Sequence, residues 1–194
     1  RTGVRLSEGY GLTESTVMLC TTHSNAEKKI GSVGYPLPGV DMKIVDPEEK
    51  EVAPGVVGEI IFRGPNRMKG YYKKPEETEN AIKDGWFYTG DLAYKDDDGY
   101  YFIVDRKKDT IIRGGFNIYP REIEEVLYKH PDIVECSVIG RPDKVFGEKT
   151  VAYIVTKSKS PKSEEFADYC KGQLADYKVP DFLEFIEALP KSGT

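Results

Sequence analysis

The sequence predicts an α+β fold in two parts, a β-rich subdomain with a distorted, barrel-like sheet and a small α+β domain with a three-stranded sheet flanked by helices. Two different residue patterns along the 194 residues support this prediction. Residues 30–104 hold short β-branched and aromatic runs between glycine and proline turns, which is typical of short antiparallel strands. From about residue 105, strand-like runs alternate with helical patterns.

In the first part, each expected strand is a short apolar run that lies between turn signals. These strands are expected at residues 42–45, 59–63 and 99–104. The turns between them are predicted at residues 38–39, 54–55 and 96–99. Pro75 is followed by a helical pattern over residues 76–83.

The second part predicts two helices and three strands. Pro120 suits the first position of a helix, which Pro131 stops, and a second helix opens at residues 160–161 and closes before Pro180. The strands are expected at residues 134–139, 151–155 and 182–186. A charged run at residues 105–108 is the expected hinge between domains at residues 1–104 and 109–194.

Composition excludes several classes of protein. A net charge of −5 with 39% hydrophobic residues is typical of a globular chain, and the acidic excess makes a nucleic-acid partner unexpected. No apolar run approaches the roughly 20 residues of a membrane span, so no transmembrane segment is expected. Three widely spaced cysteines favour a reducing, cytoplasmic compartment. With only two histidines beside them, a zinc site is not expected. The oligomeric state stays open.

Two segments that suggest ligand sites are better explained as turns. Six residues separate Gly140 from Gly147, whereas a P-loop has four between its glycines, so residues 140–150 are expected to be a surface turn. The acidic run at residues 96–99 lacks the alternating ligands of a calcium loop, and we expect a hairpin turn there.

Residues 8–14 and 86–91 carry groups suited to a nucleotide. The first segment places an aromatic ring between glycines, which allow close backbone approach to a flat ring, and then Thr13 and Glu14 for a phosphate and Mg²⁺. A simple glycine turn explains it equally well. The second ends at Asp91, whose ionised carboxylate can accept hydrogen bonds from both hydroxyls of a ribose or can cap a turn.

Two further segments complete the set. Residues 58–64, with the later Gly-Tyr-Tyr at 70–72, are expected to be strand and turn residues that build the platform. Residues 105–124 combine an Arg-Lys-Lys run with a Gly-Gly pair, which alone indicates a solvated turn and a tight hairpin.

Because these segments occur together in this order, the sequence resembles the C-terminal part of the adenylate-forming (AMP-binding) acyl-CoA synthetases. It is most similar to bacterial long- or medium-chain fatty acyl-CoA ligases, through YGLTE, DGWFYTGDL, VDRKKDTIIRGGFNIYPREIEEVL and LPKSGT. The resemblance implies that residues 1–104 end a large AMP-binding domain and that residues 109–194 form a small mobile domain.

The resemblance also implies ligands and residue roles. The ligands are ATP or AMP, Mg²⁺, coenzyme A and a carboxylic acid, which is a fatty acid in the similar enzymes. Thr13 would meet the α-phosphate and Glu14 the magnesium ion, while Asp91 and Arg106 would hold the ribose hydroxyls from both sides of the joint between two lobes. The implied adenine contacts are Glu8, Gly9, Tyr10 and Gly11.

Four roles follow for the second part. Lys108 falls at the hinge, Gly114 and Gly115 would line a tunnel for the pantetheine arm, and Asn117 would contact the adenylate. The family's adenylation lysine lies in a P-K-x-x-x-G-K pattern, and the sequence stops at Thr194 before it. The TSGTTGxPKG phosphate loop is also absent, so the fragment itself is expected to be inactive.

Two alternatives remain. One keeps the family and changes the product, as in a fatty acyl-AMP ligase, a peptide-synthetase adenylation domain or a luciferase-like oxygenase. The other is a non-catalytic scaffold that retains the fold.

Overall fold

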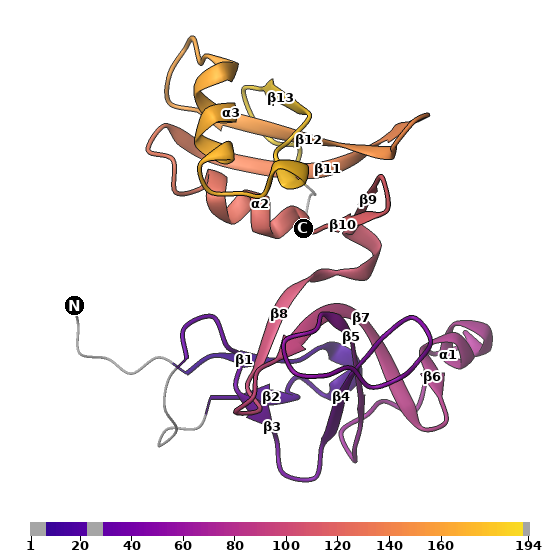
Figure 1. Ribbon diagram of the computed structural model, residues 1–194. Coiled ribbons are helices and arrows are strands. Elements are labelled where there is room, and N and C mark those ends of the chain that lie inside the picture. Colours follow the sequence, from indigo (N-terminus) through magenta and orange to yellow (C-terminus); the bar gives the residue numbers. More distant parts are fainter. Residues whose placement is uncertain (1–6, 23–28, 192–194) are drawn as a thin grey trace. The chain divides into compact units, whose positions relative to one another are not determined.

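The computed structural model describes residues 7–22 and 29–191. It divides into two compact units, Arg1–Lys107 and Lys108–Thr194, hereafter unit 1 and unit 2 (Figure 1). Three sheets and three α-helices within the described residues make the fold α+β, as the sequence predicts. The longest of these helices has nine residues, whereas a membrane span needs about 20.

Unit 1 contains two antiparallel sheets. The small one pairs β1 (Gly9–Tyr10) with β2 (Cys20–Thr21), and β2 with β3 (Tyr35–Pro36). The larger has the order β4-β5-β7-β6, with β8 also paired to β7. Its strands are β4 (Asp41–Val45), β5 (Gly58–Arg63), β6 (Ile82–Lys83), β7 (Trp86–Lys95) and β8 (Tyr101–Arg106). Neither sheet closes into a barrel within the part of unit 1 that the structure describes.

Strand β7 organises the larger sheet because it pairs with β5, β6 and β8 (Figure 1). Its partner β5, and β4 on the far side of β5, contribute Ile60, Phe62, Met42 and Ile44 to one buried core, which Phe87 of β7 joins. The acidic run at residues 96–99 forms the hairpin turn between β7 and β8, as expected.

Two boundaries in unit 1 differ from expectation. Helix α1 (Pro75–Ala81) ends earlier than residue 83 because Ile82 and Lys83 pair with β7. Strand β8 extends through Asp105 and Arg106, which pair with Leu92 and Asp91, so the charged run expected as a hinge begins inside a sheet. The rest of that run lies in a 3-10 turn, Lys107–Asp109.

Unit 2 is built on one mixed sheet with the order β10-β9-β12-β11, and β13 runs parallel to β12. The strands are β9 (Ile111–Arg113), β10 (Phe116–Ile118), β11 (Ile133–Asp143), β12 (Gly147–Thr156) and β13 (Phe182–Phe185). The three expected strands are β11, β12 and β13. The sheet is larger than three strands because the segment around the Gly-Gly pair folds into the hairpin β9–β10 and joins β12.

Two helices share one core with this sheet. Helix α2 (Pro120–Leu127) begins at Pro120, as expected, and buries Ile123 and Leu127. Helix α3 (Ser163–Lys171) buries Phe166 and Cys170 against the same core, and it begins at Ser163 rather than at the expected residues 160–161.

The segment at residues 140–150 is mostly strand rather than a surface turn. Strands β11 and β12 pair as far as Asp143 and Gly147, which leaves only residues 144–146 to turn the chain. The carboxylate of Asp143 accepts hydrogen bonds from the backbone N–H groups of Val145 and Phe146, both at 2.9 Å, and these bonds hold its pKa below the ordinary value.

Candidate functional site

The Thr-Gly-Asp sequence at residues 89–91 forms a bulge in β7. Strand β5 places Glu59 opposite Leu92 and Ile61 opposite Tyr88, so the single residue Ile60 faces the whole tripeptide. The hydroxyl of Thr89 donates to the carbonyl of Ile60 at 2.8 Å and accepts the N–H of Asp91 at 3.1 Å. Gly90 has φ +72°, a left-handed value that favours glycine.

Asp91 meets two other predicted residues at this bulge. The hydroxyl of Tyr10 donates to Oδ2 of Asp91 at 2.6 Å, and Nε of Arg106 lies 3.5 Å from Oδ1. The side chain of Asp91 is 16% exposed, whereas that of Arg106 is 63% exposed. Burial, followed by the hydrogen bond to Asp91, raises the pKa of Tyr10 well above its ordinary range. The tyrosine therefore stays protonated and remains a donor.

Asp91 and Arg106 belong to the same unit and face each other on neighbouring strands. The expectation that they approach from opposite sides of a joint between two lobes is therefore wrong. The reason is that β8 continues through Arg106, and the division between the units follows Lys107. The alternative in which Asp91 caps a turn is also wrong, because it lies within β7.

The glycines on either side of Tyr10 are needed by the chain's own packing. A Cβ added at Gly11 would lie 1.7 Å from the carbonyl oxygen of Val17, and one at Gly9 would lie 3.0 Å from Sδ of Met18. Glu8 precedes them with an exposed side chain, and its backbone pairs with Thr22. At Gly11 the close approach is between backbone segments, whereas at Gly9 the nearest atom belongs to the end of the Met18 side chain.

Glu14 is held by a tyrosine from the Gly-Tyr-Tyr sequence. The hydroxyl of Tyr71 donates to Oε1 of Glu14 at 2.9 Å, and the carbonyl of Glu14 accepts the N–H of Met68 at 2.7 Å. Burial, and then Glu14, raises the pKa of Tyr71 to about 12. Thr13 lies beside Glu14 in a 3-10 turn and is exposed.

Glu14 fits Mg²⁺ only with help from a ligand. Within residues 7–22 and 29–191, no group of three or more His, Cys, Asp or Glu side chains could hold a metal ion. Mg²⁺ commonly binds one or two carboxylates together with substrate phosphates. Among the residues that the structure describes, none donates a hydrogen bond to Oε2 of Glu14, so that oxygen can face a metal ion carried by a nucleotide.

The predicted residues of unit 2 lie on exposed turns and strands. Gly114 and Gly115 turn the β9–β10 hairpin with φ +58° and +87°, which confirms the tight hairpin. A Cβ at Gly115 would meet no atom of the described residues within 4 Å, so the space on that side of the backbone is open. Asn117 on β10 and Lys108 in the 3-10 turn are both exposed.

Two residues that hold the site in place, Glu59 and Tyr71, lie in the segments that were expected only to build the platform. Glu59 is buried on β5 and binds both Gly90 and Lys107, and Tyr71 fixes Glu14. An acidic residue inside the apolar run of residues 58–62 is a signal for Glu59, because a buried carboxylate needs partners. No comparable signal pairs Tyr71 with Glu14, since 57 residues separate them.

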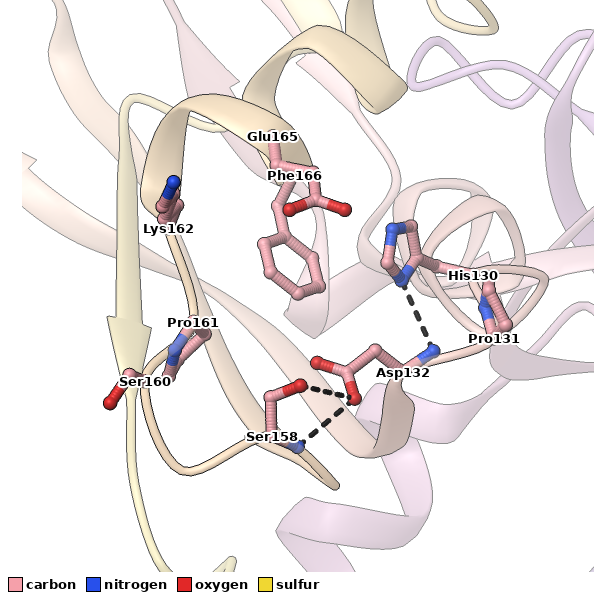
Figure 2. A pocket seen from close by; sticks show the side chains of 9 residues that line it. All are labelled: His130, Pro131, Asp132, Ser158, Ser160, Pro161, Lys162, Glu165 and Phe166. Atoms are coloured by element: carbon pink, nitrogen blue, oxygen red, sulfur yellow. Dashed lines mark hydrogen bonds between the residues drawn. The ribbon is translucent and has the colours of Figure 1, made fainter.

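A separate pocket of about 400 Å³ lies in unit 2 (Figure 2). His130 and Asp132 line it from the loop after α2, and Ser158 and Lys162 line it from the loop before α3. Figure 2 shows Asp132 accepting hydrogen bonds from N and Oγ of Ser158, each at 3.0 Å. The carboxylate is already used to join the two loops, and the lining includes none of the predicted site residues.

Two family models match the chain. One described as AMP-binding enzyme matches residues 1–72, and one described as AMP-binding enzyme C-terminal domain matches residues 122–194.

Curated relatives include two bacterial enzymes named long-chain-fatty-acid–CoA ligase. The one from Bacillus subtilis (strain 168) is 47% identical over 197 residues, covering 99% of this chain and 35% of the relative. The one from Escherichia coli O157:H7 is 44% identical over 192 residues, covering 99% and 34%. A feruloyl-CoA synthase from Amycolatopsis sp. is 43% identical over 194 residues, covering 99% and 40%. The chain spans about a third of the length of the two ligases.

Two solved structures are also similar to this chain. ATP-bound MatB from Rhodopseudomonas palustris matches with a TM-score of 0.91 and 39% identity, covering all of this chain and 39% of that one. The o-succinylbenzoate coenzyme A synthetase from Bacillus subtilis, in complex with ATP and magnesium ion, matches with a TM-score of 0.86 and 38% identity, covering 95% and 38%.

Proposed function

We propose that this chain, which belongs to the AMP-binding enzyme family, supplies part of the nucleotide site of an ATP-dependent acyl-CoA ligase. The reaction has two steps. A carboxylate oxygen of the acid attacks the α-phosphorus of ATP, which gives acyl-AMP as pyrophosphate leaves. The thiolate of coenzyme A then attacks the acyl carbonyl carbon, and AMP leaves.

The observation that carries this proposal is the cluster of Tyr10, Asp91 and Arg106 in unit 1. The largely buried carboxylate of Asp91 accepts hydrogen bonds from the two ribose hydroxyls, and the Tyr10 hydroxyl fixes its orientation. Because Arg106 is largely exposed, it can turn towards a bound nucleotide at little cost. Holding the sugar this way aims the α-phosphorus at the acid, and such positioning is central to phosphoryl-type transfer.

Further residues complete the proposed nucleotide site. The backbone and ring of residues 8–11 face the adenine, and Thr13 offers its exposed hydroxyl to the α-phosphate. Glu14 holds Mg²⁺ through the oxygen that Tyr71 leaves available. When bound, the metal ion neutralises phosphate charge. These assignments are supported by the ATP bound in the similar structure of MatB, and by the ATP and magnesium ion in that of the o-succinylbenzoate coenzyme A synthetase.

In unit 2 we propose a path for coenzyme A. The bare backbone of Gly114 and Gly115 lets the thin pantetheine arm pass, and Asn117 contacts the adenylate. Lys108 is the proposed hinge, because it follows the last strand of unit 1 and begins unit 2. A large change of backbone angle at one such residue is a common way for domains to rotate.

A fatty acid is the acid we propose, because the similar ligases carry that name. The feruloyl-CoA synthase is nearly as similar, so an aromatic acid is the second candidate. Thioester formation with palmitate and with ferulate separates the two. If the reaction stops at acyl-AMP and no thioester forms, an acyl-AMP ligase would be favoured instead.

Two further expectations belong to this proposal. The 194-residue chain contains no TSGTTGxPKG phosphate loop, so by itself it releases no pyrophosphate from ATP above background. A cytoplasmic location is proposed because Cys20, Cys136 and Cys170 are free and buried.

The test uses the full-length protein, meaning the longer protein that contains this chain, and its Asp91→Ala variant. Asp91→Ala is expected to weaken ATP binding by ~10–100-fold, the usual worth of hydrogen bonds to a charged group, and to leave acid binding unchanged. Asp41→Asn is the control, because it removes an exposed carboxylate from β4 that pairs with Arg63 of β5. Calorimetry that gives equal ATP affinity for Asp91→Ala and wild type would contradict the ribose role.

A further inference from the structure

We propose that Glu59 is a positioning residue that sets the orientation of Asp91 and Arg106 together. The proposal rests on the proposed nucleotide function and assigns a role to a residue outside the nucleotide contacts. Oε1 of Glu59 accepts the N–H of Gly90 at 3.0 Å, and Oε2 accepts Nζ of Lys107 at 2.8 Å. Gly90 precedes Asp91 in the chain and Lys107 follows Arg106, so one carboxylate holds the neighbours of both ribose residues.

Burial makes this carboxylate depend on its two partners. The side chain of Glu59 is 9% exposed and lies on β5 beside the buried Ile60 and Ile61. Burying a charged group is costly unless it is paired and hydrogen-bonded. Since each oxygen has one donor, losing either donor leaves part of the carboxylate unsatisfied. The arrangement therefore resists rotation of the side chain.

On the Gly90 side, the carboxylate stabilises a conformation that the strand alone would not adopt. Gly90 lies at φ +72° in the middle of the bulge, where its N–H points to Glu59 instead of a strand partner. Thr89 fixes the other two contacts of the bulge, to Ile60 and to Asp91. Together these bonds decide where the Asp91 side chain leaves the sheet.

On the Lys107 side, the ion pair between Lys107 and Glu59 restrains the residue that directly follows β8. Lys107 is 58% exposed, so the pair is screened by solvent and is worth little by itself. Its effect is on orientation, because it keeps Oε2 turned towards β8 and leaves Oε1 for Gly90. It also fixes the backbone next to Arg106.

The experiment compares Glu59→Ala, Glu59→Gln and Lys107→Met in the full-length protein, with AMP affinity measured by calorimetry. Glu59→Ala leaves the Gly90 N–H without an acceptor and is expected to weaken AMP binding by about tenfold or more. Glu59→Gln keeps an oxygen for Gly90, so it is expected to recover most of that loss and to match Lys107→Met at about two- to fivefold. Asp41→Asn, which removes the exposed pair with Arg63 on β4 and β5, is expected to match wild type.

Two readouts separate positioning from general stability. The KM for ATP should rise while the KM for the acid stays constant. In an Arg106→Ala background, Glu59→Gln should have no further effect on AMP affinity, because the residue through which its lost ion pair with Lys107 acts is gone. If Glu59→Ala does not fold, this second measurement still tests the positioning role of Glu59.

The outcomes are distinct. Three results would each overturn the role of Glu59: folded Glu59→Ala with wild-type AMP affinity, Glu59→Gln that binds AMP as weakly as Glu59→Ala, or additive losses of affinity in the Arg106→Ala background. In each of these cases, the nucleotide function is still supported if the wild-type protein binds AMP and the Asp91→Ala variant does not. Wild-type protein that binds no AMP contradicts the nucleotide function itself.

Discussion

The hydroxyl of Tyr10 donates a 2.6 Å hydrogen bond to Oδ2 of Asp91, although 81 residues separate them. The bond joins the small sheet, where Tyr10 lies on β1, to the bulge of β7 in the larger sheet. It also occupies one oxygen of the carboxylate proposed to hold the ribose, so the tyrosine and the nucleotide must share Asp91.

Removing this hydrogen bond tests its contribution. Tyr10→Phe in the full-length protein keeps the ring and is expected to weaken AMP binding by about two- to tenfold, less than Asp91→Ala, because the carboxylate remains but is less restrained. Calorimetry measures the effect. Tyr35→Phe, which removes a hydroxyl from β3 of the same small sheet, is the control. A tighter complex in Tyr10→Phe would mean that the tyrosine competes with the ribose.

Gly11 is expected to be intolerant of any side chain. Its added Cβ would lie 1.7 Å from the Val17 carbonyl oxygen, so Gly11→Ala should lower the free energy of unfolding of unit 1 by about 1–3 kcal/mol or more. Trp86, the single tryptophan of these 194 residues, lies in unit 1, and its fluorescence in the 194-residue chain reports the unfolding of that unit. Gly172→Ala in unit 2, with its nearest contact at 3.6 Å, should leave the Trp86 transition unchanged. Equal urea midpoints for Gly11→Ala and wild type would show that the backbone relaxes easily.

The stability of unit 1 should fall at alkaline pH because of Cys20. Burial raises the pKa of its thiol to about 12, against roughly 8.5 for an unfolded chain. Below about pH 8.5 both states are protonated, and above it the unfolded state loses the proton first, so unfolding is favoured as pH rises. The slope is at most about 1.4 kcal/mol per pH unit.

The check is urea unfolding followed by Trp86 fluorescence from pH 7 to 10. Cys20→Ala should flatten the decline, whereas Cys170→Ala in unit 2 should not alter it. An unchanged slope in Cys20→Ala would assign the alkaline effect to other groups.

The hinge proposal predicts a split between the two half-reactions. Lys108→Pro fixes a backbone angle at the first residue of unit 2, so the full-length protein should still form acyl-AMP but should form thioester more slowly. Lys108→Ala removes the ammonium group without restricting the backbone and should spare both steps. Pyrophosphate release and thioester assays measure the steps separately. Equal loss of both in Lys108→Pro would count against a hinge at this residue.

Much of the local structure could be predicted from the sequence. The turn at residues 96–99, the hairpin at Gly114-Gly115 and the start of α2 at Pro120 follow from residue types whose backbone preferences act over a few positions. The attachment of that hairpin, β9–β10, to the sheet of unit 2 and the extension of β8 through Arg106 could not be predicted. Both depend on pairing with another strand: β9 pairs with β12, which is distant in sequence, and β8 pairs with β7, which lies before the turn at residues 96–99.

The sequence by itself determined the motifs, their order and the family to which the chain belongs, because these depend on residue identity and spacing alone. Only the tertiary structure decided that Asp91 accepts the Tyr10 hydroxyl, that Arg106 faces it from the same unit, and that Glu59 holds the chain beside both. The physical reason is strand register. Three residues of β7 bulge opposite one residue of β5, and that offset fixes which side chains meet.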